Sequence, residues 1–277
     1  MSEHRSGAEA RSSIEQSEHR ASQKPSGAEA RAAVRRFVTP VRDWRAPEIA
    51  PRREDVIATA VALGTFLALL VSVLADAGLV FVDAPLHDWV VDHANAQAAA
   101  RVRLFTYLGA VEILIPTGML VGLLLCRWYR SWWPAFVMSA AYVGAIMSGS
   151  FLKKAVHRPE PYDVVGDLGR SFPSGHTTQT AAVWVMIAIL VVIRLRAGGR
   201  AHWAAWAIPA LAGAANLAVG VAMIYRGSHW LTDIVGGYAL GGFWVASTLV
   251  WARPELVRAA ARFGRGTGAA RPRRSPG

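Results

Sequence analysis

The sequence contains a single cysteine and few charged residues. One thiol, Cys126, excludes an intramolecular disulfide and any cysteine-rich metal cluster. Charged residues make up 18% of the 277, below the roughly 25% of a typical soluble domain. Because 53% of the residues are hydrophobic and the mean hydropathy is +0.28, the chain is too apolar for an ordinary soluble domain and is expected to be a membrane protein.

Large apolar residues are nearly absent from the first 54 residues. Ser, Ala, Glu, Arg and Gly dominate there, and two short segments recur: residues 2–5 as 17–20, and residues 6–11 as 26–31. Such a segment cannot bury enough surface to order itself. We therefore expect residues 1–54 to be a disordered, basic, low-complexity tail. The first apolar run begins only after Asp55, so a cleavable signal peptide is not expected.

Six apolar runs follow Asp55, each close to the ~20 residues that a helix needs to cross about 30 Å of hydrocarbon. Backbone polar groups in lipid must be satisfied within each segment, which predicts helices. The expected fold is an all-α polytopic membrane protein, a six-transmembrane-helix bundle over residues 55–252. The predicted spans are Val56–Ala75, Leu104–Cys126, Trp133–Leu152, Thr177–Ile193, Trp203–Ile224 and Leu231–Trp251.

Between the first two spans, residues 80–91 place Phe81, Leu86 and Trp89 among aspartates. This mixture predicts a short amphipathic helix at the membrane interface.

Acidic residues are scarcer than basic ones, and the basic residues fall unevenly on the two sides of the predicted bundle. The chain has 19 Asp and Glu against 30 Lys and Arg, a formal net charge of +11. Six crossings put both termini on one side, and 23 of the 30 basic residues fall on that side against 7 on the other. The positive-inside rule then predicts cytoplasmic termini in a plasma (inner) membrane, with residues 253–277 as a second basic cytoplasmic tail.

Two loops on the extracytoplasmic side hold most of the polar residues of the predicted membrane domain. In the second loop, His229 and Asp233 stand four residues apart at a predicted helix start and therefore share one face. The carboxylate can accept a proton from one imidazole nitrogen, which leaves the other nitrogen unprotonated as a nucleophile or base.

The first loop ends in Pro173-Ser174-Gly175-His176 at the start of the fourth predicted span. Free backbone N–H groups and the positive end of the helix dipole favour an anion there. Lys and Arg side chains upstream can complete a cage for a phosphate. Each feature by itself also has an ordinary structural reading: a capped helix end, a turn, or interfacial lysines. Their joint occurrence on one side of an otherwise apolar domain favours a functional site.

These residues resemble the type 2 phosphatidic acid phosphatase and haloperoxidase superfamily, whose membrane members are six-helix lipid phosphatases. The family pattern is Lys, six residues, Arg-Pro; then Pro-Ser-Gly-His; then Ser-Arg, five residues, His, three residues, Asp. The resemblance extends over residues 56–251. It implies that His229 attacks phosphorus, Asp233 orients and compensates that imidazole, and His176 protonates the leaving alkoxide. It also implies phosphate-binding roles for Lys153, Ser174 and the Gly175 N–H, and no metal or other cofactor.

The sequence departs from this family pattern at both arginines. Glu160 stands where the first Arg is expected, and Met223 where the second is expected. Arg158, two residues before Glu160, and Arg226, three residues after Met223, are the candidates to replace them in binding the substrate.

Three hypotheses remain open at this stage. The first is a phosphatase for a lipid phosphate or diphosphate, of polyprenyl or glycerolipid type, in the outer leaflet. The second keeps the phosphohistidine but transfers the phosphoryl or phospho-head group to a lipid or sugar hydroxyl. The third is a non-catalytic relative that binds a lipid phosphate. A nucleic-acid partner is not expected, because no folded basic face accompanies the charge. The sequence indicates no oligomeric state.

Overall fold

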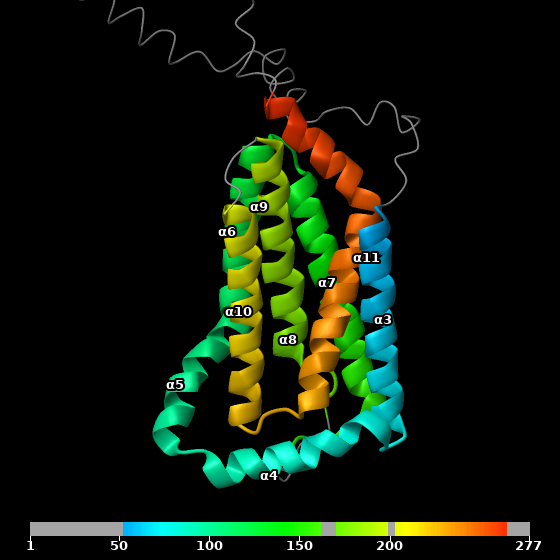
Figure 1. Cartoon of the computed structure of the whole chain (residues 1–277), viewed down its shortest axis with the longest axis vertical. Coiled ribbons are helices and arrows are strands. Elements are labelled where there is room, and N and C mark those ends of the chain that lie inside the picture. The colour runs from blue at the N-terminus through cyan, green and yellow to red at the C-terminus, as the bar shows by residue number, and fades with distance from the viewer. Residues whose placement is uncertain (1–51, 162–169, 199–202, 265–277) are drawn as a thin grey trace, which may run out of the picture. The chain divides into compact units, whose positions relative to one another are not determined.

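The computed structural model describes residues 52–161, 170–198 and 203–264. The predicted tail and its repeats, apart from its last residues 52–54, lie outside these ranges, as do residues 265–277. Figure 1 shows the described helices, labelled from α3 onward. They are α3 (Arg53–Leu74), η1 (Gly78–Val82), α4 (Asp83–His93), α5 (Ala96–Thr106), η2 (Tyr107–Gly109), α6 (Val111–Tyr129), α7 (Trp133–Val156), α8 (Gly175–Thr180), η3 (Ala181–Val185), α9 (Met186–Ala197), α10 (Ala204–Tyr225) and α11 (Leu231–Gly264).

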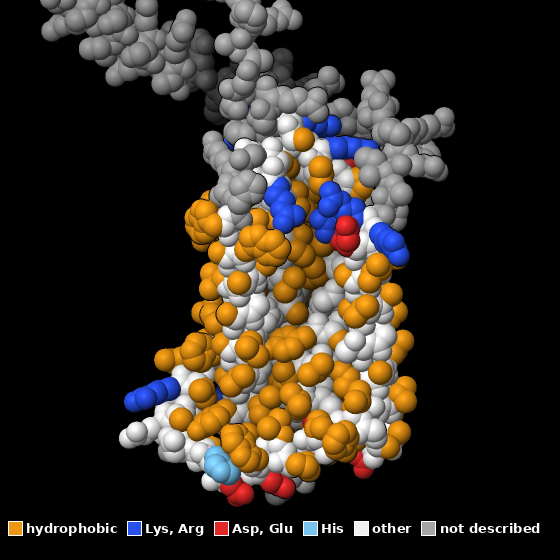
Figure 2. All heavy atoms as spheres, in the orientation of Figure 1, with side chains coloured by type: hydrophobic (Ala, Val, Ile, Leu, Met, Phe, Trp, Pro, Cys, Tyr) orange, Lys and Arg blue, Asp and Glu red, His pale blue; other side chains and the backbone are white. Residues whose placement is uncertain are grey.

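The predicted all-α membrane fold is confirmed. Six helical stretches among the described residues are long and apolar enough to cross a membrane: α3, α6, α7, the continuous stretch Gly175–Ala197, α10 and α11. The stretch Gly175–Ala197 consists of α8, a π-helical segment at η3, and α9. Their outer surfaces are rich in exposed large apolar side chains, such as Phe151, Leu211 and Leu217, which is the surface that lipid requires. Figure 2 shows this apolar covering along the length of the bundle.

The second span begins later than the sequence indicated. Residues 104–106 belong to α5, and Tyr107–Gly109 form a 3-10 turn before α6 begins at Val111. Ala110 has an extended backbone, with φ −74° and ψ 138°, which separates the two helices. Residues 80–91, predicted as one short interfacial helix, are divided between η1 and α4, and α5 follows as a further short helix. In Figure 1, α4 and α5 lie across one end of the bundle.

Helix α11 packs against α3, α7, α8 and α9 and is the most buried of the six spanning stretches. It continues past Trp251 to Gly264, so residues 253–264, which we expected in the C-terminal tail, are helical. Leu256, Ala259 and Ala260 are buried there in the main apolar cluster with Leu190 and Leu249, which explains why the helix does not stop. Arg253 also forms a bidentate ion pair with buried Asp55, which ties this extension to the start of α3.

Candidate active site

The two histidine motifs meet at the end of the bundle that carries α4 and α5. Figure 1 shows the start of α8 and the connection from α10 to α11 at this end, whereas α3 begins and α11 ends at the other. Two hydrogen bonds join the motifs: the Ser174 backbone N–H donates to the Asp233 carbonyl at 3.1 Å, and the Thr177 hydroxyl donates to the Ile234 carbonyl at 3.2 Å. Segments almost sixty residues apart in sequence therefore form one polar site.

Glycines in α11 allow α8 to approach closely enough for this junction. A Cβ on Gly237 would lie 2.1 Å from the Thr177 hydroxyl oxygen and 2.7 Å from the Ser174 carbonyl oxygen. One turn later, a Cβ on Gly241 would lie 2.5 Å from the Thr178 carbonyl oxygen. Small residues four apart are a common means by which membrane helices bring their backbones together.

We expect Gly237→Ala to separate the two motifs. The added methyl group has no space beside Thr177, so α8 must move away from α11. Overpacking of this kind typically costs about 1–3 kcal/mol in the free energy of unfolding. The unfolding temperature and the rate of phosphate release, both measured in detergent, should fall together. Gly242→Ala is the matched control, because a Cβ there meets nothing within 4 Å. Equal behaviour of the two variants would contradict the proposed role of the close approach.

His229 and Asp233 lie together as their spacing predicts. The His229 Nδ1 is 3.5 Å from Asp233 Oδ2, so the two are an ion-pair distance apart but not hydrogen-bonded. The Nδ1 atom is buried without a hydrogen-bond partner in the described part of the chain. Asp233 is fully buried, and its Oδ2 accepts from the Trp230 backbone N–H at 3.0 Å. The carboxylate thus caps α11 and also faces the imidazole ring.

Arg158 forms two ion pairs beside the predicted catalytic residues. Its Nη1 donates to Asp233 Oδ1 at 2.6 Å and to the Thr232 hydroxyl at 2.7 Å, and its Nη2 donates to Asp83 Oδ2 at 2.7 Å. The guanidinium carbon also lies 5.6 Å from the centre of the Trp230 ring. With both terminal nitrogens bound to carboxylates, Arg158 neutralises Asp233 and fixes its position. The substrate-binding role expected for Arg158 stays a prediction.

Asp83 is a component of the site that the sequence did not reveal. It lies at the start of α4, is 4% exposed, and accepts the Thr232 backbone N–H at 3.0 Å and the Thr232 hydroxyl. These contacts connect the short helix α4 to the start of α11. In the sequence, Asp83 is one of several aspartates in an amphipathic segment, and nothing there signals a partner about 150 residues away.

His176 is partly buried and lies close to the other polar groups of the site. It is within electrostatic range of His229, Lys153, Arg226 and one carboxylate, Glu112. Its ring rests against the backbone of η2, because a Cβ on Gly109 would lie 3.2 Å from His176 Cδ2. The break before α6 therefore supports one face of the imidazole.

Three of the predicted phosphate-binding groups lie together at the start of α8. Ser174 is fully buried, and its hydroxyl oxygen has no hydrogen-bond partner among the described residues. The Lys153 side chain passes Gly175, with its Cε 3.8 Å from where a Gly175 Cβ would stand. Its ammonium group donates to the Arg170 carbonyl. A buried hydroxyl and the free N–H groups of a helix start can receive an anion here.

Met223, where the second family arginine is expected, and its candidate replacement Arg226 have different environments. Met223 is 2% exposed and packs with Val219 and Ile234, so this position faces the apolar core. Arg226 follows the end of α10, where Gly227 adopts a left-handed φ of 64° and turns the chain toward His229. Arg226 is exposed and lines a pocket at the side of the site. It is near His176 but does not occupy the environment of Met223.

The described residues contain no group of three or more His, Cys, Asp and Glu side chains arranged to hold a metal ion. The metal-independence implied by the resemblance stays a prediction.

Comparison with known proteins agrees with the motifs. Residues 131–256, which hold both histidine motifs, match the family model of the PAP2 superfamily. The likeness to this superfamily therefore covers residues 131–256. The match confirms the family resemblance found in the sequence, and with it the predicted class, a membrane hydrolase of phosphoric esters.

Two relatives illustrate the likeness. Phosphatidylglycerophosphatase B of Bacillus subtilis (strain 168) is 29% identical over 161 residues, which cover 54% of this chain and 77% of the relative. A crystal structure described as the first transmembrane PAP2-type phosphatidylglycerolphosphate phosphatase from Bacillus subtilis matches with a TM-score of 0.58 at 22% identity. That match covers 76% of this chain and 98% of the solved chain. At this identity the structural likeness shows a shared fold.

Proposed function

We propose that this PAP2 protein hydrolyses a lipid phosphate or diphosphate, of glycerolipid or polyprenyl type, through a phosphohistidine on His229. The observation that carries the proposal is the junction of the two motifs, which brings His229, His176 and the unpartnered Ser174 hydroxyl to one end of the bundle. The same junction also serves a phosphotransferase, so the acceptor has to be found by experiment.

The chemistry assigned to His229 follows from its neighbours. Asp233 faces Nδ1, which favours the tautomer with its proton on that nitrogen and leaves Nε2 with a free lone pair. In the first step Nε2 attacks phosphorus, a P–N bond forms, and the P–O bond to the lipid alcohol breaks. His176 in its protonated form donates its proton to the departing alkoxide. Asp233 offsets the positive charge that the phosphorylated ring carries.

The second step reverses the proton transfer. His176, now neutral, takes a proton from a water molecule as that water attacks phosphorus, and the P–N bond breaks to release phosphate. The Ser174 hydroxyl, the Gly175 N–H and the Lys153 ammonium hold phosphate oxygens as charge shifts between them. Arg158 acts indirectly in this scheme, because its two ion pairs with Asp83 and Asp233 fix the carboxylate behind His229.

We propose that the site faces the extracytoplasmic side and that both termini are cytoplasmic. The positive-inside count supports this orientation. Figure 2 shows Lys and Arg side chains gathered near the end where α3 begins, and acidic side chains at the opposite end, which carries α4. The short helices α4 and α5 at that end would lie at the outer headgroup level, where a lipid phosphate is presented.

A substrate panel tests the proposed function. We expect the purified protein in detergent to release inorganic phosphate from at least one of diacylglycerol phosphate, phosphatidylglycerol phosphate and polyprenyl diphosphate. Transfer of labelled phosphate to an added lipid alcohol without free phosphate would identify a transferase instead. Binding of these lipids with neither release nor transfer would identify a non-catalytic relative. The His229→Ala variant serves as the background in every assay.

A further inference from the structure

We propose that Arg103 and Arg226 form a second anion-binding subsite beside the reaction centre, which accepts a further anionic group in the headgroup of the substrate. The preferred substrate class is then a lipid that carries a phosphate monoester and a second phosphate a few bonds away. This inference rests on the proposed function, because it specifies the substrate of the same site.

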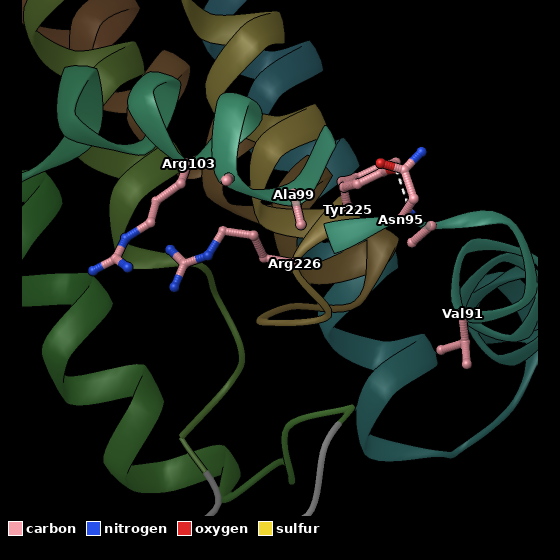
Figure 3. A pocket seen from close by; sticks show the side chains of 8 residues that line it. Val91, Asn95, Ala99, Arg103, Tyr225 and Arg226 are labelled. Atoms are coloured by element: carbon pink, nitrogen blue, oxygen red, sulfur yellow. Dashed lines mark hydrogen bonds between the residues drawn. The ribbon is translucent and has the colours of Figure 1, made fainter. Parts of the chain in front are cut away.

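The subsite is a pocket of about 480 Å³ between the end of α4, helix α5 and the end of α10. Its polar lining consists of Asn95, Arg103, Tyr225 and Arg226, and the remaining lining residues are Val91, Ala94, Ala99 and Ala100. Figure 3 shows the side chains of Arg103 and Arg226 extending in the same direction, with their guanidinium groups at one end of the pocket. A pocket of this size admits a polar headgroup.

The charges of this pair are not balanced by the described protein. Arg103 and Arg226 are both exposed, and neither forms an ion pair with a described carboxylate. Other arginines at the ends of the bundle, such as Arg158 and Arg253, do have carboxylate partners. Two guanidinium groups facing one pocket repel each other, and a phosphate between them relieves the repulsion and receives paired N–H donors.

The wall that presents Arg103 is fixed in place. The Asn95 backbone N–H donates to the Tyr225 hydroxyl at 3.2 Å, and the Asn95 side chain caps α5 by accepting the Ala98 N–H at 2.8 Å. Ala99 and Arg103 stand four apart on α5 and share the face toward the pocket. Because Tyr225 directly precedes Arg226, the contact that anchors α5 also sets the position of the two arginines relative to each other.

Arg226 connects the pocket to the catalytic residues. It is within electrostatic range of His176 and is separated from His229 by only Gly227 and Ser228. A headgroup with its reacting phosphate on Ser174 and Gly175 therefore has Arg226 at its side, and a second anionic group extends toward Arg103. A lipid with one phosphate has no second anionic group for Arg103 to bind.

The test compares two substrates in neutral detergent: diacylglycerol phosphate, with one phosphate, and phosphatidylglycerol phosphate, with two. We expect a higher kcat/KM for the second in the unmodified protein. Arg103→Gln should reduce the ratio of the two kcat/KM values about ten- to hundredfold, which is the usual contribution of a hydrogen bond to a charged group. Arg101→Gln is the matched control, because Arg101 is exposed on the same helix but does not line the pocket.

Two results would overturn the proposal. One is an unchanged substrate preference in Arg103→Gln. The other is an equal loss of kcat/KM on both substrates, which would assign the two arginines to the reacting phosphate or to folding. A third result, in which added phosphatidylglycerol stimulates turnover only when Arg103 is present, would show that a neighbouring lipid occupies the pair.

A binding measurement covers the case in which neither lipid is hydrolysed. Methylenediphosphonate should raise the unfolding temperature of the unmodified protein at lower concentrations than methylphosphonate does, and Arg103→Gln should remove this difference. Failure of turnover alone would thus reject the proposed function, whereas equal stabilisation by the two phosphonates would reject the subsite.

Discussion

Replacing His229 with alanine is expected to reduce phosphate release by at least about a thousandfold, because loss of a nucleophile removes the covalent route altogether. The fold should survive, since His229 donates no hydrogen bond through Nδ1 and belongs to none of the buried apolar clusters. Phosphate release from the best lipid of the panel measures the effect, and thermal unfolding in detergent verifies the fold.

The matched control is His157→Asn. His157 is exposed, follows α7 with a left-handed φ of 52°, and has no role in the proposed reaction. Asparagine tolerates that backbone conformation better than most residues. His157→Asn should keep the activity of the unmodified protein. A His229→Ala variant that retains more than a few per cent of the turnover would rule out His229 as the nucleophile.

The second large effect is expected from Arg158→Met, which leaves Asp83 and Asp233 buried without their cation. Asp83 is 4% exposed and Asp233 is fully buried. Removing one partner of a buried ion pair typically costs about 3–5 kcal/mol, because an uncompensated charge stays in the interior. We expect a clearly lower unfolding temperature, together with a loss of turnover as Asp233 loses its fixed position behind His229.

Two further variants separate this explanation from simple loss of packing. Arg258→Met breaks a partly exposed pair with Glu255 and should cost less than about 1 kcal/mol. Adding Asp83→Asn to Arg158→Met removes one of the two stranded charges and should recover part of the stability. If the double variant is no more stable than Arg158→Met, the charge explanation is wrong.

The membrane architecture was predictable because its signals are local. Apolar runs of about twenty residues determine a spanning helix without reference to the rest of the chain. The predicted starts at Trp133 and Leu231 agree with α7 and α11. The predicted end of the last span, at Trp251, differs from the end of α11 at Gly264. The burial of Leu256 and Ala260 depends on neighbouring helices and not on an uninterrupted apolar run.

The site was predictable only where its chemistry is concentrated in short motifs. The Pro173–His176 segment and the His229–Asp233 pair could be recognised because function fixes their spacing. The role of Arg158 could not, because an arginine beside a phosphate motif and an arginine bound to Asp83 have the same sequence signature. Asp83 and Arg103 come from the segment between the first two spans, and only the fold brings them beside residues more than seventy positions later.

The most direct test of the central claim is to trap the phosphorylated enzyme. We expect rapid quenching with a ³²P-labelled substrate from the panel to leave acid-labile, alkali-stable label on the protein, located by mass spectrometry on His229. A His176→Gln variant given 4-nitrophenyl phosphate, whose leaving group departs without protonation, should accumulate this intermediate, because the base for its hydrolysis is missing. Label on another residue would contradict the phosphohistidine mechanism. So would turnover without any labelled protein in both the unmodified protein and the His176→Gln variant.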